Sequence, residues 1–450
     1  MLDSVSQSIL GFYFPQKVYD ISLQHLYIKP RKTGGSYGIG GRRVMKYTIE
    51  NVNGYSNESD WGVMGTNLIK DLYIDKCVLN RVDVHFQAWN VTIKNSDITG
   101  DQGILLNGGG LLYIDNVTVK HARNIFIEFR NDYGATWNGD IVINNSTIKV
   151  KSSEPTRIIY MLPTDFDYKY PIVFGKSIKV TNFTMDYSDF KTNTAKSWLM
   201  SFANFSSGSN IGRIQFPSKI LFENIRVKGR EKGTALFTIN NPREYLLDKK
   251  GSFIDGQIIP NCHMIFKNID GEKNENVVFN SSFGSSLAIE GSFESTYLDE
   301  YALYPKIEIE NYGQGFVAML RGSIADVYVT NTEVNAIESY TSTGNRSKFT
   351  FINCDFKSNV NMDLQTLRFS NDIKPTFINS KFYPITIKGV TYTDNASMLD
   401  RYAVFYINRH VFHNHVNTKI SKSIQTAIPL TTPFVNALAN HHENQVSDAV

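Results

Sequence analysis

The sequence predicts an all-β protein, a right-handed parallel β-helix in which similar coils stack on one another. A short phrase of alternating apolar and polar residues recurs along most of the chain, as in Leu111–Val119, LLYIDNVTV. Its period of two residues is typical of a strand rather than a helix. Copies are spaced by 19 to 44 residues. A unit of this size cannot bury its own apolar face, so it must stack on copies of itself.

One position of the phrase is almost always Asn. This residue tolerates left-handed backbone geometry, and stacked Asn side chains can hydrogen-bond to one another and to the turn of the next coil. We therefore expect a turn and a ladder of side chains at this position. The residues that occupy it are His25, Asn51, Lys76, Asn95, Asn116, Asn145, Asn182, Asn224, Asn268, Asn311, Asn331, Asn353 and Asn379.

The intervals between copies vary along the chain. Many match one coil of ~20–25 residues, but those between Asn145 and Asn311 are near 42 residues. Each longer interval holds either one coil with a long loop or two coils, and Trp198–Ala203, Ala235–Asn240 and Val277–Phe279 look like further strands. Insertions gather on one face of a solenoid, often the binding face. We therefore expect the function in the middle of the chain.

The phrase also predicts three regions. Residues 1–17 lack it and are predicted to cap the first coil, residues 18–408 form the β-helix, and residues 409–450 form a C-terminal tail. Such a tail closes the stack or intertwines with neighbouring copies. The segment Lys29–Arg43 is rich in Gly and basic residues, but it lacks the spacing of a P-loop and is interpreted as a connecting loop.

Composition excludes several function classes. The 46 basic and 43 acidic residues are too evenly balanced to suggest nucleic acid or an anionic membrane as a partner. No apolar run approaches 18 residues, which argues against membrane insertion, and Met1–Leu10 lacks the features of a signal peptide. The 29 Phe and 24 Tyr residues exceed what a core usually needs, so some should form a binding surface.

Cysteines make no disulfide framework. Cys77 and Cys354 directly follow the ladder position, where Ser96, Ser146 and Ser380 also fall. We expect both thiols to be small core groups within a stack rather than reactive ones.

A second strand in most coils leads to candidate catalytic residues. In Ile125–Arg130, strict alternation directs Phe126, Glu128 and Arg130 outward. When the second strands of successive coils are aligned, His85 and Glu128 share one column. They are two coils apart, at ~9.6 Å, a distance near the upper limit for the carboxyl pair of an inverting glycosidase. Alternatively, these charges solvate an exposed face, and Arg130 neutralises a neighbouring acid.

A closer pair of carboxylates follows in the next loops. Aligning Phe129 with Leu162 places Asp132 and Asp165 at the same offset. Adjacent coils lie ~4.8 Å apart, so the two carboxylates can approach to ~5 Å, the separation of a retaining pair. Asp132 and Asp165 are therefore predicted as the acid and the nucleophile or base, with Glu128 as a third candidate.

The loop Arg130–Asp140, RNDYGATWNGD, mixes acids, an Arg, aromatics and glycines. Sugars stack on aromatic rings while carboxylates and Arg bond their hydroxyls, so Arg130, Tyr133 and Trp137 are candidate substrate-binding residues. Further substrate-binding candidates are His85, Asp167 and Tyr168. Alternatively, Tyr133 and Trp137 only fold the loop onto the stack.

Five of the nine histidines lie in the tail, and His413 and His415 point to the same side of an extended segment. In a threefold assembly, six such rings can surround one axial metal ion. The alternative is that they are exposed tail residues. No other cofactor is expected.

Taken together, the coil phrase and the stretch Phe129–Ile141, FRNDYGATWNGDI, resemble the pectate-lyase-like β-helices of bacteriophage tailspikes and appendages. The matching loop residues are Asp132, Tyr133 and Trp137. The His-x-His of trimeric phage fibres is similar to His413-Asn-His415. This resemblance implies a homotrimer that binds, and often cleaves, a polysaccharide or teichoic acid of the host surface.

The resemblance also implies a place in the virion. Such a protein is assembled in the host cytoplasm, attaches to other virion tail proteins and acts outside the cell during adsorption. The expected activity is a glycan-degrading hydrolase. One alternative is a non-catalytic adhesin or structural spike that grips the same glycan, and another is a bacterial polysaccharide lyase or epimerase.

Overall fold

The computed structural model describes residues 2–3, 10–12, 18–29, 39–54, 64–130, 137–161, 172–190, 197–202, 214–215, 217–229, 233–239, 263–270, 275–281, 306–312, 316–319, 326–338, 348–356, 360–362, 376–380, 385–387, 390–392 and 404–406. Within these residues every regular element is a strand and none is a helix. The predicted all-β class is therefore confirmed. This described part has, accordingly, no helix that is long and apolar enough to cross a membrane.

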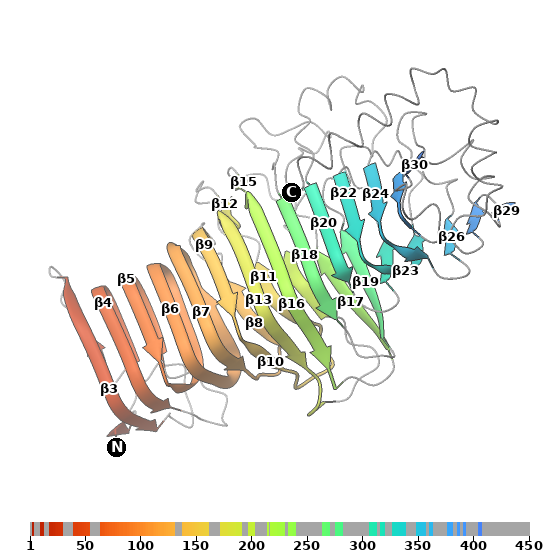
Figure 1. Ribbon diagram of the computed structural model, residues 1–450. Coiled ribbons are helices and arrows are strands. Elements are labelled where there is room, and N and C mark those ends of the chain that lie inside the picture. The colour runs from red at the N-terminus through yellow and green to blue at the C-terminus, as the bar shows by residue number, and fades with distance from the viewer. Residues whose placement is uncertain are drawn as a thin grey trace, which may run out of the picture.

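The principal series of strands contains the recurring phrase. Each of these strands pairs in parallel with the next copy, so that Ile93 faces Ile114 and Ile114 faces Ile143. Figure 1 shows them side by side in chain order. They are β3 (Tyr19–Lys29), β4 (Ile39–Gly54), β5 (Met64–Asp75), β6 (Val78–Leu106), β7 (Gly108–Val119), β9 (Trp137–Asn144), β13 (Ser177–Asp186), β16 (Lys219–Lys228), β18 (His263–Asp270), β20 (Lys306–Tyr312), β22 (Asp326–Thr330), β24 (Lys348–Ile352), β27 (Thr376–Ile378) and β30 (Val404–Tyr406).

A second series of strands alternates with the first in the sequence. Its members also pair in parallel with one another. It begins in the later part of β6, which pairs with β8. Its other members include the three extra strands that the sequence predicted around residues 198, 235 and 277. The series is β8 (Ile125–Phe129), β11 (Thr156–Met161), β14 (Ser197–Phe202), β17 (Gly233–Ile239), β19 (Glu275–Ser281), β21 (Phe316–Met319), β23 (Glu333–Glu338) and β25 (Asp355–Phe356).

The remaining strands are short. β1 (Leu2–Asp3) and β2 (Leu10–Phe12), from the segment predicted as a cap, pair in parallel with β3 and β4. β10 (Thr147–Lys149) lies between the ends of β7 and β13, and β12 (Ile172–Val173) pairs with β15 (Ile214–Gln215). β26 (Val360–Met362) pairs with β28 (Ile385–Ile387), and β28 forms an antiparallel pair with β29 (Val390–Tyr392).

Direct pairing also explains the long intervals. β13 pairs with β16, β16 with β18, and β18 with β20, residue against residue. Each interval near 42 residues therefore holds one repeat plus a long connection, because no further copy of the principal strand lies between its partners.

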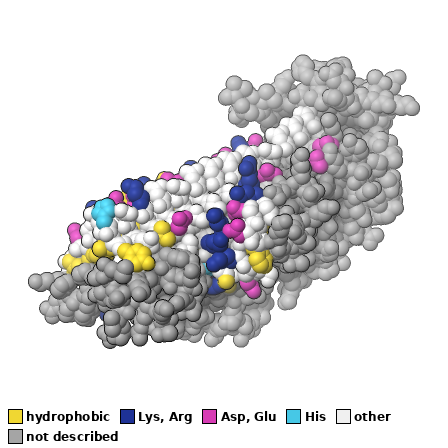
Figure 2. All heavy atoms as spheres, turned by 90° about the horizontal axis from the view of Figure 1, so that it is seen from below, with side chains coloured by type: hydrophobic (Ala, Val, Ile, Leu, Met, Phe, Trp, Pro, Cys, Tyr) yellow, Lys and Arg dark blue, Asp and Glu magenta, His cyan; other side chains and the backbone are white. Residues whose placement is uncertain are grey.

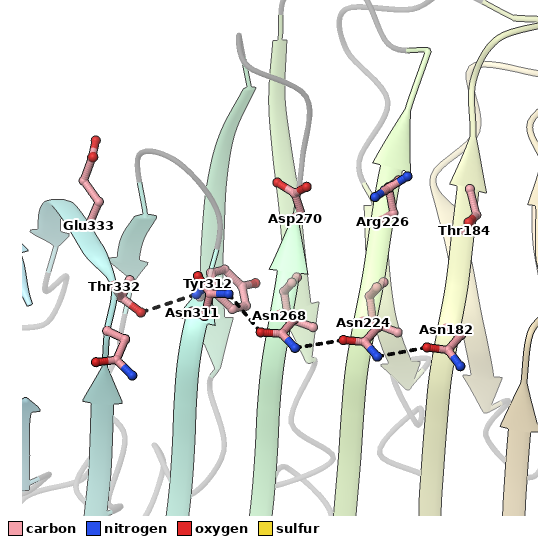
Figure 3. A pocket seen from close by; sticks show the side chains of 13 residues that line it. Asn182, Thr184, Asn224, Arg226, Asn268, Asp270, Asn311, Tyr312, Thr332 and Glu333 are labelled. Atoms are coloured by element: carbon pink, nitrogen blue, oxygen red, sulfur yellow. Dashed lines mark hydrogen bonds between the residues drawn. The ribbon is translucent and has the colours of Figure 1, made fainter. Parts of the chain in front are cut away.

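The predicted ladder is present. All thirteen ladder residues have φ between 47° and 56°, the left-handed geometry that Asn tolerates. The side-chain amide of Asn268 donates to Oδ1 of Asn224 at 2.8 Å, and Asn224 donates to Asn182 at 2.9 Å. Figure 3 shows this row continuing to Asn311. A turn that recurs at one position holds successive strands in the same register.

A continuous apolar core runs along the stack. From β3 to β24, the inward residues of the principal strands, such as Leu112 and Ile114, are buried against their counterparts in neighbouring repeats. The position after the ladder holds a small buried group in some repeats, such as Cys77, Ser96 and Cys354, and a large one in others, such as Phe183 and Tyr312. There Cys77 donates its backbone N–H to Oγ of Ser96 at 3.0 Å, and Cys354 does the same to Ser380 at 3.2 Å. Both thiols are buried.

A second corner was not predicted. Arg43, Leu68 and Gln87 occupy matching positions and have φ of 63°, 55° and 54°. None of these residue types signals left-handed geometry, so the sequence gives no sign of the corner. The interpretation of Lys29–Arg43 as a loop is also wrong at its C-terminal end, because β4 begins at Ile39 and pairs with β5.

Candidate functional site

The described residues include only part of the predicted site. Glu128, Arg130, Trp137 and His85 have defined positions. The other catalytic and substrate-binding candidates, Asp132, Tyr133, Asp165, Asp167 and Tyr168, and the metal candidates His413 and His415, lie outside the described residues.

The register between β8 and β11 differs from the predicted one. Phe129 pairs with Met161 rather than with Leu162, because Ile127 pairs with Ile159 and keeps the apolar columns aligned. The predicted alignment is wrong by one residue. The inference that Asp132 and Asp165 share one offset depended on that alignment, so it loses this support.

Trp137 does not belong to a binding surface. Its side chain is fully buried at the start of β9, and its ring centroid lies 5.9 Å from that of Phe129. A buried ring cannot stack on a sugar, so the substrate-binding role predicted for Trp137 is wrong. The alternative, in which this aromatic residue packs onto the stack of strands, describes it correctly.

Strict alternation also fails in β8, where all five residues are buried. Phe126 was expected outside but packs edge-on against Phe183, with ring centroids 4.8 Å apart. The strand follows a corner at Asn124, whose φ is 51°, and its pairing with β11 omits Phe126. This corner reorients the start of the strand, so Phe126 turns toward the core.

Asp83 is the centre of a buried group of charges. Its carboxylate is fully buried and pairs with the guanidinium of Arg81. Nη1 of Arg130 lies 3.1 Å and 3.2 Å from its two oxygens, and Nδ1 of His85 lies 3.6 Å away. Arg130 therefore neutralises a neighbouring acid, which was the alternative considered for it. A buried carboxylate needs such partners because desolvation otherwise disfavours its charge.

Glu128 is the second buried carboxylate. Its side chain is only 4% exposed and pairs with the guanidinium of Arg123. Burial raises the pKa of Glu128, even though Arg123, Arg130 and Arg81 act in the opposite direction. Glu128 was expected on an exposed face, but the residues around it remove most of that exposure. We call Arg81, Asp83, Arg123, Glu128 and Arg130 the arginine–carboxylate cluster.

An aromatic group adjoins this cluster along the stack. Glu128 pairs with Tyr160 of the next repeat, and Arg157 pairs with Trp198 of the one after. The guanidinium of Arg157 lies 4.9 Å from the Tyr160 ring centroid and 4.6 Å from that of Trp198. Cation–π contacts of this kind hold both rings in fixed positions. We call Arg157, Tyr160 and Trp198 the aromatic group.

His85 belongs to the same wall. Ala88 pairs with Gly108, and the same offset takes His85 to Leu105, which pairs with Glu128. His85 and Glu128 then occupy one column, two repeats apart. The cluster and the aromatic group therefore follow one another along the axis of the stack, which is the arrangement that a linear polymer needs.

Sequence reasoning missed Arg81, Asp83, Arg123, Arg157 and Trp198. A signal for two of them exists, because Arg81, Asp83 and His85 alternate with the apolar residues Val82 and Val84. Four arginines, counted against the carboxylates Asp83, Glu128 and Glu154, leave the wall with an excess of positive charge, which favours an anionic ligand. No three His, Cys, Asp or Glu side chains among the described residues are grouped as a metal site.

A groove of about 730 Å³ follows the ladder on another part of the surface. Its floor is the row of ladder residues from Asn182 to Asn331, and Arg226, Asp270 and Glu333 line its side. Figure 3 shows the ladder amides bonded to one another along this floor. Its lining is mostly polar, and the ladder bonds already use much of the hydrogen-bonding capacity of the amides.

Comparison of the chain with known proteins identifies no related protein. No protein-family model matches this chain, and neither the curated proteins nor the solved structures contain a match.

Proposed function

We propose that the chain is a right-handed parallel β-helix that binds and hydrolyses an anionic glycan of a host cell surface, as a trimeric appendage of a phage virion. The observation that supports the site best is Glu128, a buried carboxyl with three arginines near it and an aromatic group beside it. A glycan, whether an acidic polysaccharide or a teichoic acid, lies along the axis of the stack in this proposal.

The raised pKa of Glu128 suits a general acid. A carboxyl that keeps its proton closer to neutral pH can donate it to the leaving glycosidic oxygen as the bond to the anomeric carbon breaks. A second carboxylate then accepts the proton from the attacking water, or attacks the carbon itself before water releases the sugar. Asp132 and Asp165 are proposed for this second role, and Asp83 is a further buried carboxylate in the described cluster.

The arginines and the aromatic rings supply binding. Guanidinium groups form paired hydrogen bonds with carboxylate or phosphate, which matches an anionic polymer. Tyr160 and Trp198 present rings beside Arg157, and sugar rings stack on such faces. The proposal places the acidic groups of the glycan on the arginine side and its apolar ring faces on the aromatic side.

Non-catalytic binding of the same glycan is the second candidate. It is favoured by the pairing of Asp83 with Arg81 and Arg130 and of Glu128 with Arg123. Ion-paired carboxylates are less available for proton transfer, and the same arginines can still hold an anionic polymer.

Cleavage of extracted cell-wall polymer and capsule tests the proposal. Wild-type protein is expected to shorten the polymer, seen as new reducing ends and as a lower mass in size-exclusion chromatography. Glu128→Gln should lose at least 100-fold of this activity while retaining binding. Glu310→Gln is the matched control, because Glu310 forms a partly exposed ion pair with Lys267 at 3.2 Å, far from the cluster in the sequence.

Each outcome decides between the candidates. Cleavage that survives in Glu128→Gln shows that Glu128 is not the acid, and binding without any cleavage by the wild type favours the adhesin. Light scattering tests the trimer, and antibody labelling of virions tests attachment to other tail proteins. Elemental analysis of the purified trimer tests the axial metal at His413 and His415.

A further inference from the structure

A second groove lies near the N-terminal end of the stack. In β6 its lining residues, Gln87 to Trp89, follow Arg81 and Asp83 of the arginine–carboxylate cluster. It has a volume of about 480 Å³ and is lined by residues of β4, β5, β6, β7 and β9. Figure 2 shows hydrophobic side chains gathering toward this end of the molecule. Met45 and Trp89 line the groove and are exposed. The groove lies beside the unpredicted corner at Arg43, Leu68 and Gln87, which line it.

Trp89 is the main aromatic feature of this groove. Its side chain is 52% exposed, which is unusual for so large an apolar group on a strand. A Cβ atom added at Gly109 would lie 3.1 Å from Cζ3 of Trp89, so the edge of the indole lies close to backbone that has no side chain. Gly109 pairs with Asn138 of the following repeat. The result is an exposed aromatic ring beside a flat, glycine-rich floor.

This geometry suits a sugar ring. Pyranose rings stack their C–H face on an aromatic ring, and they need open space beside it. Gln87 and Asn138 line the same groove, and their side-chain amides can donate to and accept from sugar hydroxyls. The glycines are also required by the backbone, because a Cβ at Gly108 would lie 1.8 Å from the carbonyl oxygen of Ala88. Close packing of the strands thus creates the floor on which a ligand can rest.

The charge of the groove specifies the ligand further. Among the described residues that line it, the charged ones are Arg43 and Lys70, and none is acidic. Lys70 occupies the position matching Trp89 in the preceding repeat, as the flanking pairs Ile69–Ala88 and Asp71–Asn90 show. A cation one strand spacing, ~4.8 Å, from the stacking ring matches a sugar that bears a carboxylate or a phosphate.

We propose that the groove around Trp89 is a second glycan-binding site, which holds one acidic sugar unit by stacking on Trp89 and by ion pairing with Lys70. The choice of a cell-surface polymer as the source of that unit rests on the proposed function. Binding at this site involves no bond cleavage. It would anchor the polymer away from Glu128 and so raise the affinity for long chains over short ones through multivalency.

Tryptophan fluorescence and calorimetry with defined probes test the site. The probes are oligogalacturonate, poly(glycerol phosphate) and neutral dextran oligomers, so that carboxylate, phosphate and uncharged ligands are separated. Wild-type protein is expected to bind at least one anionic probe and to bind dextran at least 10-fold more weakly. Trp89→Ala should weaken binding of the anionic probe 10-fold or more, and Lys70→Met should weaken it several-fold and reduce its salt dependence.

Leu111→Ala is the matched control, because Leu111 is an exposed apolar residue of β7 that does not line the groove. It should leave binding unchanged. Equal affinity of Trp89→Ala and wild type for every probe would overturn the proposal. A change of oligomeric state in Trp89→Ala with unaltered probe binding would assign the groove to contact between copies, which also overturns it.

The two proposals fail separately. Glu128→Gln should keep the probe binding that depends on Trp89, and Trp89→Ala should keep the cleavage of short substrates at Glu128. Loss of cleavage in the wild type, with Trp89-dependent binding intact, would refute the hydrolase alone. The second site alone would be refuted by two results together. Trp89→Ala would cleave long and short polymers as the wild type does, and the wild type would bind none of the probes.

Discussion

Asn95 donates its side-chain amide to Oδ1 of Asp75 at 2.8 Å, one residue before the ladder position that Lys76 occupies. In most other repeats the amide bonds to the ladder residue of the preceding repeat, as Asn268 does to Asn224, but Asn145 likewise donates to Asp115, the residue before Asn116. The Lys76 side chain has no acceptor, and the neighbouring carboxylate accepts the bond, as Asp115 also does beside Asn116. The ladder is therefore interrupted at Lys76 although the backbone there has the same left-handed φ of 51°.

Replacement Lys76→Asn should stabilise the protein. Asn tolerates left-handed geometry better than Lys, and its amide would lie between Asn51 and Asn95 in the ladder, so we expect a gain of about 1 kcal/mol. Little is lost, because the Lys76 side chain is 63% exposed and its ion pairs with Glu50 and Asp75 are 3.9 Å and 3.8 Å long. Urea denaturation measures the difference.

Lys179→Asn is the control for this prediction. Lys179 lies in β13 within the principal series and is exposed, but its backbone φ is not left-handed. Asn is unfavourable in a regular strand, so this variant should lose a few tenths of a kcal/mol. A similar change in both variants would show that the ladder geometry is not responsible.

Asn268 tests the two contributions of a ladder residue separately. Its amide donates to Asn224 at 2.8 Å, and its Oδ1 accepts from Asn311 at 2.9 Å. Asn268→Ala removes both bonds and places a side chain that disfavours positive φ at 51°, for a loss of about 2–4 kcal/mol. Asn268→Gly removes the bonds but keeps the permitted geometry, so it should be about 1 kcal/mol more stable than the Ala variant. Equal stability would show that backbone strain contributes nothing.

The ladder also shows why so much of the fold was predictable. A period of two and a recurring Asn act locally in every copy, so the thirteen ladder positions and the parallel register could be predicted from the sequence. The second corner, at Arg43, Leu68 and Gln87, could not, because its left-handed residues have no shared chemistry. There the backbone geometry is imposed by the packing of neighbouring strands rather than by the residue types.

The site was less predictable, since it depends on register and burial together. A shift of one residue between Phe129 and Met161 changed the predicted neighbours of the following loops. Alternation identified Glu128 but predicted exposure for it. Its ion-pair partner Arg123 lies only five residues earlier, whereas Arg81 acts on its charge from a distant part of the sequence. An interaction with a residue as distant in the sequence as Arg81 has no signature in a local pattern.

Trp137→Ala should damage stability rather than binding. The side chain is fully buried beside Phe129, and removal of such a ring leaves a cavity that costs about 3–5 kcal/mol. At a low temperature at which the Trp137→Ala variant is folded, it should bind the glycan with the affinity of the wild type. If Trp137→Ala has normal stability but binds the glycan weakly, Trp137 is a substrate-binding residue after all.

Both described thiols should be unreactive in the folded protein. Burial raises the pKa of Cys77 and of Cys354 to about 11, and only the thiolate reacts with disulfide reagents. At pH 8, Ellman's reagent should therefore modify at most the third cysteine, Cys262, until denaturant is added, when all three react. Rapid modification of two or more thiols in the native protein would contradict the burial of Cys77 and Cys354.

Glu128 should make stability depend on pH in a direction opposite to that of most acidic residues. Burial raises its folded pKa above the ordinary value of 4.5, so the folded state binds the proton more tightly than the unfolded state. Its contribution is present below pH 4.5 and is lost as pH rises through the folded pKa. Glu128→Gln lacks this titration, so its stability relative to wild type should improve from pH 4.5 upward. Denaturation curves at intervals from pH 4 to pH 8 measure this difference. A constant difference between Glu128→Gln and wild type would show that burial and the arginines cancel, and a trend of opposite sign would show that the arginines outweigh burial.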